Sequence, residues 1–349
     1  MKTVAITGGG TLGHIVPALA VAAVLQKQGH KVFWIGSKKA DERAFVEARG
    51  IEFFSISTGK FRRYFSIRNL ATPFAVLAGY FQARGILRRM RPDALFSKGG
   101  FVSVPPALAA AGLGIPVVTH ESDASCGLAT RIIARRADVV CLGQEQARIK
   151  TGARVVFTGN PIRADLNEGD GESFRRKLGI GADMPVVLVL GGSQGARRLS
   201  DTVVQGASQL TGRCRIVLQT GKGKLYDTVP EGVIQFESFD ADYADALAAA
   251  DVVVSRAGAG AVAELQAAGK PAVLVPLGTD ASRGDQIRNA ELAGQRGTAV
   301  VAGYDDVIEK TAALVYNDVL RKKFSDSCAR ACIKDGAQAI AEVVLEVCK

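Results

Sequence analysis

Short apolar runs alternate with longer stretches of helical pattern along this chain. Residues 2–7 are an apolar run that leads into the glycine-rich turn 8–14 and then into an apolar helical pattern. The same order recurs about 183 residues later, where residues 185–190 lead into the glycine-rich turn 191–197. A strand, a glycine-rich turn and a helix open a doubly wound α/β domain. The repetition therefore predicts two such domains in tandem.

Further short runs rich in valine and isoleucine continue this alternation. Most lack a strict exchange of apolar and polar positions, which is typical of parallel strands buried on both faces. We predict such strands at residues 31–35, 94–96, 117–119, 139–142, 155–157, 215–219, 233–235, 252–255 and 272–275. The junction is expected near Gly159-Asn160-Pro161, which divides the chain into domains at residues 1–162 and 163–334. Ligands bind outside the carboxyl ends of such strands, so we expect a site in the cleft between the domains.

The composition fits a globular protein of two domains. The chain has 349 residues, of which 48% are hydrophobic and 22% charged, and this excludes a disordered protein. No apolar run reaches the ~20 residues of a membrane span, and no signal-peptide pattern precedes the first strand. We therefore expect a cytosolic protein. The six cysteines form no C-x-x-C pair, so buried free thiols are expected rather than a disulfide or a metal site.

Positive charge is concentrated in the first half of the chain. The formal net charge is +10, yet residues 1–160 hold 22 basic and 9 acidic side chains, against 22 and 25 in residues 161–349. Residues 57–91 carry eight basic side chains and no acidic one, interleaved with aromatic residues. One apolar face of this segment must pack on the sheet, but a basic amphipathic surface also suits anionic lipid headgroups. The residues expected to meet a membrane are Arg62, Arg63, Phe65, Arg68, Phe74, Phe81, Arg84 and Arg88. A nucleic-acid partner is disfavoured because no nucleic-acid-binding motif accompanies the segment.

The first glycine-rich turn has the form G-x-G-x-x-G at Gly8, Gly10 and Gly13. A dinucleotide site would need an acidic residue at the end of the second strand, and none is present there, which disfavours NAD. Anion binding at a helix N-terminus remains, and Ser193 and Gln194 give the second turn the same capacity. A third turn at residues 98–101 is a weaker candidate. The alternative is that these glycines only permit tight turns.

Four polar residues at predicted strand or helix ends are candidates for chemistry. His14 is placed to act as a general base, or else only to cap its helix. His120 and Glu121 follow each other at the end of another predicted strand. Glu264 lies at the start of a helix, where it suits a ribose diol or simply complements the helix dipole. The polar stretch 276–286 suits sugar hydroxyls. The pair Asp240 and Asp242 has Asp-x-Asp spacing but is better interpreted as a helix N-cap, so no metal site is expected.

Seven strings occur in an order that resembles the MurG family, the UDP-N-acetylglucosamine:lipid I transferases of glycosyltransferase family 28. They are TGGGTLGHIVPALA, SKGGFVSVP, HESD, GNPIR, LGGSQGARRLS, SRAGAGAVAELQAAGKP and VPLG…SRGDQIRNA. The resemblance implies the GT-B fold, two Rossmann-like domains facing a cleft, with the last segment, 335–349, packing back on the first domain. It implies inverting transfer of N-acetylglucosamine (GlcNAc) from UDP-GlcNAc to the 4-hydroxyl of the acceptor's N-acetylmuramic acid. The product is lipid II for peptidoglycan synthesis.

The resemblance also implies partners and a location. No metal or other cofactor is expected, because the nucleotide sugar is a substrate. The expected partners are UDP-GlcNAc, lipid I, an anionic membrane surface and other proteins of cell-wall synthesis. The chain would be peripheral, on the cytoplasmic face of the cell membrane.

By the same similarity, individual residues receive roles. The catalytic group would be His14, Glu121 and Asp123, and the acceptor pyrophosphate would meet Gly9, Gly10, Gly99 and Gly100. The donor-binding residues would be Thr11, Gly13, Arg163, Ser193, Gln194, Phe239 through its backbone, Glu264, Asp285 and Gln286. Two positions depart from the commoner family pattern: Leu12 stands where many members have glycine, and Asp123 where many have asparagine. The role of position 123 stays open, because a carboxylate cannot donate the hydrogen bonds of an amide.

Three alternatives remain from the sequence. Two are related GT-B enzymes, namely a glycosyltransferase for another lipid acceptor and a UDP-GlcNAc 2-epimerase. The third, from a different class, is a regulator that binds nucleotides or nucleic acid through the basic segment.

Overall fold

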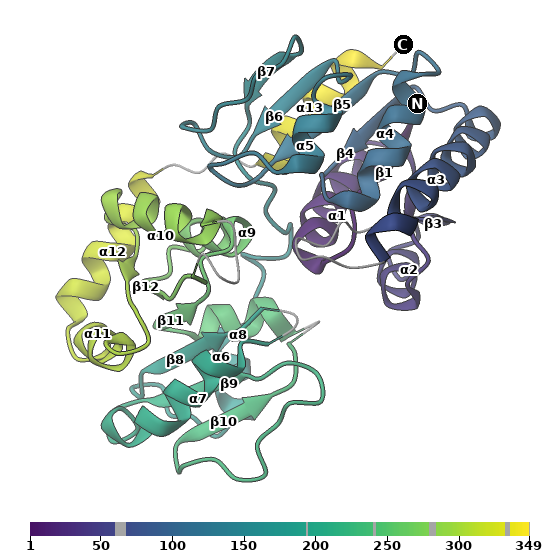
Figure 1. The fold of residues 1–349 in the computed structure, drawn as a ribbon. Helices are drawn as coiled ribbons and strands as arrows, with labels where there is room; N and C mark the ends of the chain where they lie inside the picture. The colour runs from purple at the N-terminus through teal and green to yellow at the C-terminus, as the bar shows by residue number, and fades with distance from the viewer. Residues whose placement is uncertain (60–67, 193–194, 240–241, 279–283, 332–335, 349) are drawn as a thin grey trace. The chain divides into compact units, whose positions relative to one another are not determined.

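The computed structural model describes residues 1–59, 68–192, 195–239, 242–278, 284–331 and 336–348 (Figure 1). It divides into two compact units, the first formed by Met1–Arg163 with Lys334–Lys349 and the second by Ala164–Ile333. Each unit is a parallel β-sheet with helices packed against it. The predicted fold class, two doubly wound α/β domains, is confirmed.

The first unit contains a seven-stranded parallel sheet with the order β3-β2-β1-β4-β5-β6-β7. Its strands are β1 (Thr3–Thr7), β2 (Lys31–Ser37), β3 (Glu52–Ile56), β4 (Ala94–Ser97), β5 (Val117–Glu121), β6 (Val139–Leu142) and β7 (Arg154–Phe157). Its helices are α1 (Leu12–Lys27), α2 (Ala40–Glu47), α3 (Arg68–Met90), α4 (Val104–Ala111), α5 (Leu128–Ile133) and α13 (Gly336–Val347), with a 3-10 turn at Phe101–Ser103.

Both faces of this sheet are buried. Neighbouring strand residues point to opposite faces, so Phe33 packs on the α3 and α4 side while Trp34 packs on the α1 and α13 side. Leu95 and Phe96 divide in the same way. This double burial explains why the strands show no alternation of apolar and polar residues in the sequence.

The last helix of the chain, α13, belongs to the first unit, as the yellow helix in Figure 1 shows. Ile340 and Val344 of α13 are fully buried in the same apolar cluster as α1. Both guanidinium nitrogens Nη1 and Nη2 of Arg154 also contact the carboxylate of Glu346, at 2.8 and 2.7 Å. Because that ion pair is exposed and screened by solvent, apolar burial is the main attachment.

The second unit contains a six-stranded parallel sheet with the order β10-β9-β8-β11-β12-β13. Its strands are β8 (Val186–Leu190), β9 (Arg215–Gln219), β10 (Val233–Phe236), β11 (Val252–Ser255), β12 (Ala272–Leu274) and β13 (Val300–Val301). Its helices are α6 (Gly171–Lys177), α7 (Arg197–Gly206), α8 (Tyr243–Ala249), α9 (Ala259–Ala267), α10 (Asp285–Gln295), α11 (Val307–Val315) and α12 (Asp318–Arg330), with a 3-10 turn at Ala207–Gln209. The order repeats that of the first six strands of the first unit, with β8 in the position of β1.

All the predicted strands are present, and two further strands escaped the sequence analysis. Strand β3 contains Glu52 and Ser55 among its five residues, and β13 has only two residues. A hydrophobic pattern does not identify a strand that contains polar residues, as β3 does, or a strand of only two residues, as in β13. Asp242 does precede α8, but its carboxylate contacts Lys177 Nζ at 3.4 Å and makes no capping hydrogen bond. The N-cap prediction is therefore right in position and wrong in its hydrogen bond, while Asp240 lies outside the described residues.

The described cysteines are thiols inside the two units. Cys126, Cys141, Cys214 and Cys328 are buried and Cys348 is half-buried, whereas Cys332 lies outside the described residues. Burial raises the pKa of the Cys141 thiol to about 12, so this thiol stays protonated and unreactive at neutral pH. Among the described residues no three His, Cys, Asp or Glu side chains gather to hold a metal ion. None of the described helices is long and apolar enough to cross a membrane.

Candidate functional site

Glycine-rich turns follow β1 and β4 at the carboxyl edge of the first unit's sheet. Gly10 has φ +90°, and a Cβ atom there would lie 2.5 Å from Cε1 of Phe101. Gly9 packs as closely on the carboxylate of Glu42. Steric demand therefore explains Gly9 and Gly10, and the contact of Gly10 with Phe101 shows that the turns after β1 and β4 lie against each other. The two turns form one surface at the N-terminus of α1, where anions are favoured.

His14 lies on this surface as the third residue of α1. Its Nδ1 atom lies 3.0 Å from the hydroxyl oxygen of Thr11. A Cβ atom on Gly100 would lie 3.0 Å from His14 Cδ2 and 3.3 Å from Nε2, so the imidazole lies against the turn after β4. When His14 Nδ1 donates to Thr11, the Nε2 atom is the basic nitrogen, which is what a general base requires.

Glu121 ends β5 and organises the turn that follows it. Its side chain is buried, and its two carboxylate oxygens accept hydrogen bonds from the backbone N–H of Asp123 at 3.2 Å and of Gly127 at 2.9 Å. Asp123 itself is half-buried. Through these two hydrogen bonds the carboxylate of Glu121 stabilises the turn that carries Asp123. The role of Glu121 seen in the structure is therefore structural.

From the sequence, Lys98 was only the first residue of the turn 98–101. In the structure its side chain is buried between the turns after β4 and β5. It directly follows β4, is 3% exposed, and its Nζ donates to Ser122 Oγ at 2.8 Å. Burial lowers the pKa of Lys98, while the negative charges of Glu121 and Asp123 oppose that shift. A lysine placed directly after an apolar strand, at the edge where ligands bind, is the signal that would have identified it.

His120 is not an accessible base. Its side chain is 1% exposed, and its Nε2 donates to the carbonyl oxygen of Gly159 at 3.0 Å. Burial and then the neighbouring Lys98 hold the pKa of His120 well below its usual value, so the ring is neutral at pH 7. The role of His120 is therefore to connect β5 to the segment after β7.

In the second unit the glycine-rich turn follows β8. Gly192 and Gly195 have φ +75° and +70°, and a Cβ atom on Gly195 would overlap the carbonyl oxygen of Thr220. The turn leads into α7, so it has the position of the turn after β1 in the first unit. Ser193 and Gln194, predicted to bind the donor diphosphate, lie outside the described residues.

Glu264 lies in α9 and has a partner that the sequence did not indicate. The hydroxyl of Tyr243, at the start of α8, donates to Glu264 Oε2 at 2.9 Å. Phe239 is a core residue: its ring is 4% exposed and packs 5.2 Å from the ring of Phe236. Its carbonyl accepts from the N–H of Asp242. Only backbone atoms of Phe239 are thus suited to ligand contact, as the resemblance implied.

Asp285 and Gln286 begin α10. Asp285 is 8% exposed, and Gln286 Oε1 accepts from the N–H of Leu277 at 3.0 Å, which fixes the start of α10 against the segment after β12. Among the other predicted donor-binding residues, Thr11 and Gly13 are exposed at the start of α1. Arg163 is half-buried and is the last residue of the segment Met1–Arg163, which forms most of the first unit.

Helix α3 carries apolar side chains on two faces. Ala83 and Leu87 are buried in the core of the first unit, whereas Phe74, Leu77 and Phe81 are 75%, 54% and 62% exposed. We call these three exposed residues the α3 stripe, since their spacing of three and four places them on one helix face. Arg88 is exposed and Arg84 Nη1 donates to the carbonyl of Gly112 at 3.3 Å. Arg62, Arg63, Phe65 and the side chain of Arg68 lie outside the described part of the chain.

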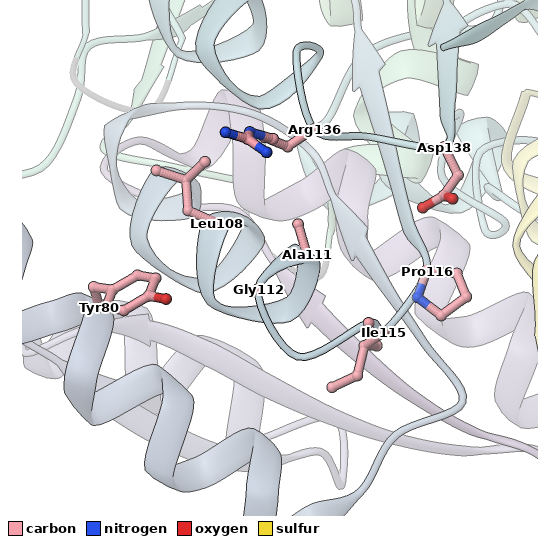
Figure 2. Close-up of a pocket in the computed structure, with 9 residues that line it drawn as sticks. Tyr80, Leu108, Ala111, Gly112, Ile115, Pro116, Arg136 and Asp138 are labelled. Carbon is pink, nitrogen blue, oxygen red and sulfur yellow. The ribbon is translucent and has the colours of Figure 1, made fainter. Parts of the chain in front are cut away.

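A cavity of about 560 Å³ lies beside α3 (Figure 2). Tyr80 of α3, Leu108 and Ala111 of α4, and the residues before β5 and β6, among them Pro116 and Asp138, line it. Because these residues precede the strands, the cavity lies at the amino edge of the sheet. It is thus at the edge opposite the glycine-rich turns, and it is not part of the candidate site.

Comparison with known proteins gives consistent results over both units. The family model "Glycosyltransferase family 28 N-terminal domain" matches residues 4–142, and "Glycosyltransferase family 28 C-terminal domain" matches residues 186–344. A protein of Lachnospira eligens is 40% identical over 329 residues, which are 93% of this chain and 92% of that protein. It is named UDP-N-acetylglucosamine--N-acetylmuramyl-(pentapeptide) pyrophosphoryl-undecaprenol N-acetylglucosamine transferase.

Two solved structures show that the fold alone does not distinguish a glycosyltransferase from an epimerase. A crystal structure of MurG from Acinetobacter baumannii matches with a TM-score of 0.75 at 29% identity, covering 99% of this chain and 100% of that one. A UDP-GlcNAc 2-epimerase from Neisseria meningitidis, solved with UDP-GlcNAc, matches with a TM-score of 0.72 at 15% identity, covering 99% and 100%. The fold is thus shared by transferases and an epimerase, and sequence identity separates them.

Proposed function

The chain belongs to glycosyltransferase family 28, and we propose that it transfers GlcNAc from UDP-GlcNAc to N-acetylmuramyl-(pentapeptide) pyrophosphoryl-undecaprenol, which is lipid I. The observation that carries this is the 40% identity, over nearly the whole chain, to a relative of that name. The fold is the GT-B fold expected from the sequence. The two related GT-B activities, an epimerase and a transferase for another lipid, are not favoured.

His14 is the general base of this proposal. Its Nε2 would take the proton from the 4-hydroxyl of the acceptor sugar while that oxygen attacks the anomeric carbon of GlcNAc. The bond between the anomeric carbon and the UDP oxygen breaks with its electron pair on UDP, and the configuration is inverted. The contact of Nδ1 with the Thr11 hydroxyl supports this role, because Nε2 is the basic nitrogen in the tautomer in which Nδ1 donates to Thr11.

The donor is assigned to the second unit. Glu264, oriented by Tyr243, would accept the ribose hydroxyls, and the Phe239 backbone would meet the uracil. Asp285 and Gln286 would contact the GlcNAc hydroxyls. The turn after β8, with Ser193 and Gln194, would receive the diphosphate at the N-terminus of α7, with Arg163 adding positive charge. Such groups stabilise the charge that develops on departing UDP without a metal ion.

The acceptor and the membrane are assigned to the first unit. Gly9, Gly10, Gly99 and Gly100 would meet the acceptor pyrophosphate. The α3 stripe with Arg84 and Arg88 would contact an anionic bilayer, so the chain would be peripheral on the cytoplasmic face. The exposure of Phe74 and Phe81 supports this proposal, since large apolar side chains exposed together mark interaction surfaces.

The test is transfer of labelled GlcNAc from UDP-GlcNAc to a soluble lipid I analogue. We expect a product with one added GlcNAc and release of UDP. UDP should also raise the melting temperature, and an oligonucleotide should not. Conversion of UDP-GlcNAc to its 2-epimer without transfer would assign the epimerase activity instead. Stabilisation by an oligonucleotide but not by UDP would assign the nucleic-acid-binding regulator.

A further inference from the structure

Lys98 connects the three loops that form the carboxyl edge of the first unit's sheet. Its backbone N–H donates to the carbonyl of Thr7, at the end of β1, and its Cβ packs on Gly8, where an added Cβ would lie 3.0 Å away. Its ammonium donates to Ser122 in the turn after β5. It is itself the first residue of the turn after β4.

Ser122, the partner of Lys98, is held at both ends. Lys98 Nζ donates to its hydroxyl at 2.8 Å, and Asn160 Nδ2 donates to its carbonyl at 3.3 Å. The next residue is Asp123, whose N–H is bound by Glu121. The conformation of the turn after β5, and with it the direction in which Asp123 is presented, therefore depends on the buried ammonium.

The second unit provides an internal comparison for Lys98. Arg256 follows Ser255 at the end of β11, as Lys98 follows Ser97 at the end of β4, and the two strands hold the same place in their sheets. Arg256 also reaches the segment after the next strand: its Nη1 donates to Val275 O at 3.1 Å. Its Nη2 donates to the hydroxyl of Tyr304 at 2.7 Å.

The two cations differ in what surrounds them. Arg256 donates to a carbonyl and a hydroxyl, both neutral, whereas Lys98 lies in the field of the carboxylates of Glu121 and Asp123. Removing a charge that balances the buried carboxylate of Glu121 and the half-buried carboxylate of Asp123 leaves them uncompensated, which costs more than losing a neutral contact. Lys98 therefore sets the charge of the turn after β5 as well as its conformation.

We propose that Lys98 is a positioning residue of the acceptor site: its buried ammonium holds Ser122 and balances Glu121 and Asp123, so that Asp123 meets the acceptor as a fixed carboxylate. The proposal rests on the proposed function.

The first experiment measures both substrates in the Lys98→Met variant, which keeps the side-chain length and removes the charge. We expect kcat/KM for the lipid I analogue to fall about tenfold or more, in keeping with a broken buried charge contact. The KM for UDP-GlcNAc should stay within about twofold of wild type, because most of the residues assigned to the donor, among them Glu264, Asp285 and Gln286, lie in the second unit. A loss of kcat/KM for the acceptor of less than about twofold overturns the proposal.

A double-mutant cycle with Asp123→Asn separates positioning from general damage. If Lys98 acts through Asp123, the double variant Lys98→Met with Asp123→Asn should stay within about twofold of Asp123→Asn alone in acceptor kcat/KM, because no carboxylate is left for the lysine to position. If the two losses simply multiply, Lys98 does not act through Asp123 and the proposal is wrong.

Two further variants keep the result interpretable. Ser122→Ala removes the partner of the ammonium without burying an unbalanced charge, so it keeps the test available if Lys98→Met does not fold. It should lower acceptor kcat/KM about threefold, as expected for one lost hydrogen bond, and an unchanged value overturns the proposal. Lys270→Met is the matched control, because Lys270 Nζ donates to the carbonyls of Ala248 and Ala250 in the second unit. It should lower the melting temperature and leave acceptor KM unchanged.

Failure of the proposed function has a different signature. If wild-type protein transfers no GlcNAc to the lipid I analogue, the proposed function is wrong whatever the variants do. If wild type transfers GlcNAc and the Lys98 and Ser122 variants match it, only the positioning role is wrong.

Discussion

Helices α3 and α8 occupy the same topological position in the two units and have opposite surfaces. Each connects the strand at one edge of its sheet to the strand beside the first one, α3 between β3 and β4 and α8 between β10 and β11. Helix α3 has 23 residues and exposes Phe74 and Phe81, whereas α8 has seven residues and buries Ala246 and Leu247. One doubly wound topology thus provides a large outward apolar surface in one unit and a compact internal helix in the other.

The polar residues of the two helices differ as well: those of α8 make contacts inside the unit, whereas those of α3 add positive charge to the surface. Tyr243 of α8 donates to Glu264, inside the part of the second unit that we assign to the nucleotide. The neighbourhood of α3 instead carries most of the excess positive charge of the chain. The comparison indicates that the fold fixes where a helix lies, while the side chains on its free face decide whether it serves a membrane or a ligand.

The largest expected effect concerns the base that we assign to the first unit. The variant His14→Ala should lower kcat by about 100-fold or more, because it removes general-base catalysis. The affinity for UDP-GlcNAc, measured by calorimetry, should stay within about twofold of wild type, because most of the residues assigned to the donor, among them Glu264, Asp285 and Gln286, lie in the second unit. An unchanged kcat would disprove the role of His14.

A second histidine of the first unit provides the control for that variant. His30 lies at the other edge of the sheet, before β2, where its Nδ1 accepts from the N–H of Lys2 at 3.1 Å. The variant His30→Ala should keep kcat within about twofold, since this ring touches none of the candidate site residues.

The next effect tests the contrast between the outer surfaces. Replacing Phe74 and Phe81 together by serine should weaken binding to vesicles containing anionic lipid about 30-fold, as expected from about 1 kcal/mol for each partly inserted ring. Vesicle sedimentation at low and high salt measures this, and binding should fall steeply as salt is added. Val319→Ser is the matched control, because Val319 is an 81% exposed apolar residue of the second unit. If both variants lost vesicle binding equally, the α3 stripe would not be the surface that binds the membrane.

A smaller effect tests the internal contact of α8. The variant Tyr243→Phe should lower UDP affinity about threefold, since it removes one hydrogen bond that orients Glu264. Isothermal titration calorimetry with UDP measures the change. Tyr316→Phe serves as control, because Tyr316 donates to the carbonyl of Gln209 elsewhere in the same unit, at 2.8 Å. If both variants bind UDP as wild type does, Tyr243 does not support the nucleotide site.

The smallest effect is an acid sensitivity of the first unit, which holds all three histidines of the chain. Burial lowers the pKa of His120 in the folded state, so below about pH 6.5 the unfolded chain binds a proton that the folded chain does not. Stability is therefore complete above that pH and falls by about 1.4 kcal/mol per pH unit below it, down to the folded pKa. Melting temperatures between pH 5 and 7.5 measure this slope, and His120→Gln should flatten it. An identical slope in the variant would assign the acid sensitivity to other groups.

Sequence alone determined the fold class and most of the strands. The runs 186–190 and 252–254 are apolar at every position, which is typical of strands buried on both faces of a parallel sheet. The two glycine-rich turns were recognisable for a local reason as well, since a Cβ atom at Gly10 or Gly195 would collide with neighbouring atoms. The family resemblance rested on these same local strings.

The tertiary structure decided which polar residues have partners and which are accessible. His120 and Glu121 are adjacent in sequence but have different surroundings. The imidazole of His120 is buried and hydrogen-bonded to the carbonyl of Gly159, whereas the carboxylate of Glu121 accepts from two backbone N–H groups. The contacts of Lys98 with Ser122 and of Tyr243 with Glu264 join residues 24 and 21 positions apart. No periodicity along a chain encodes such pairs, because they arise only when parallel strands bring the turns at their carboxyl ends together. Strands follow from local apolar pattern, whereas the charge balance of a site depends on contacts that folding alone creates.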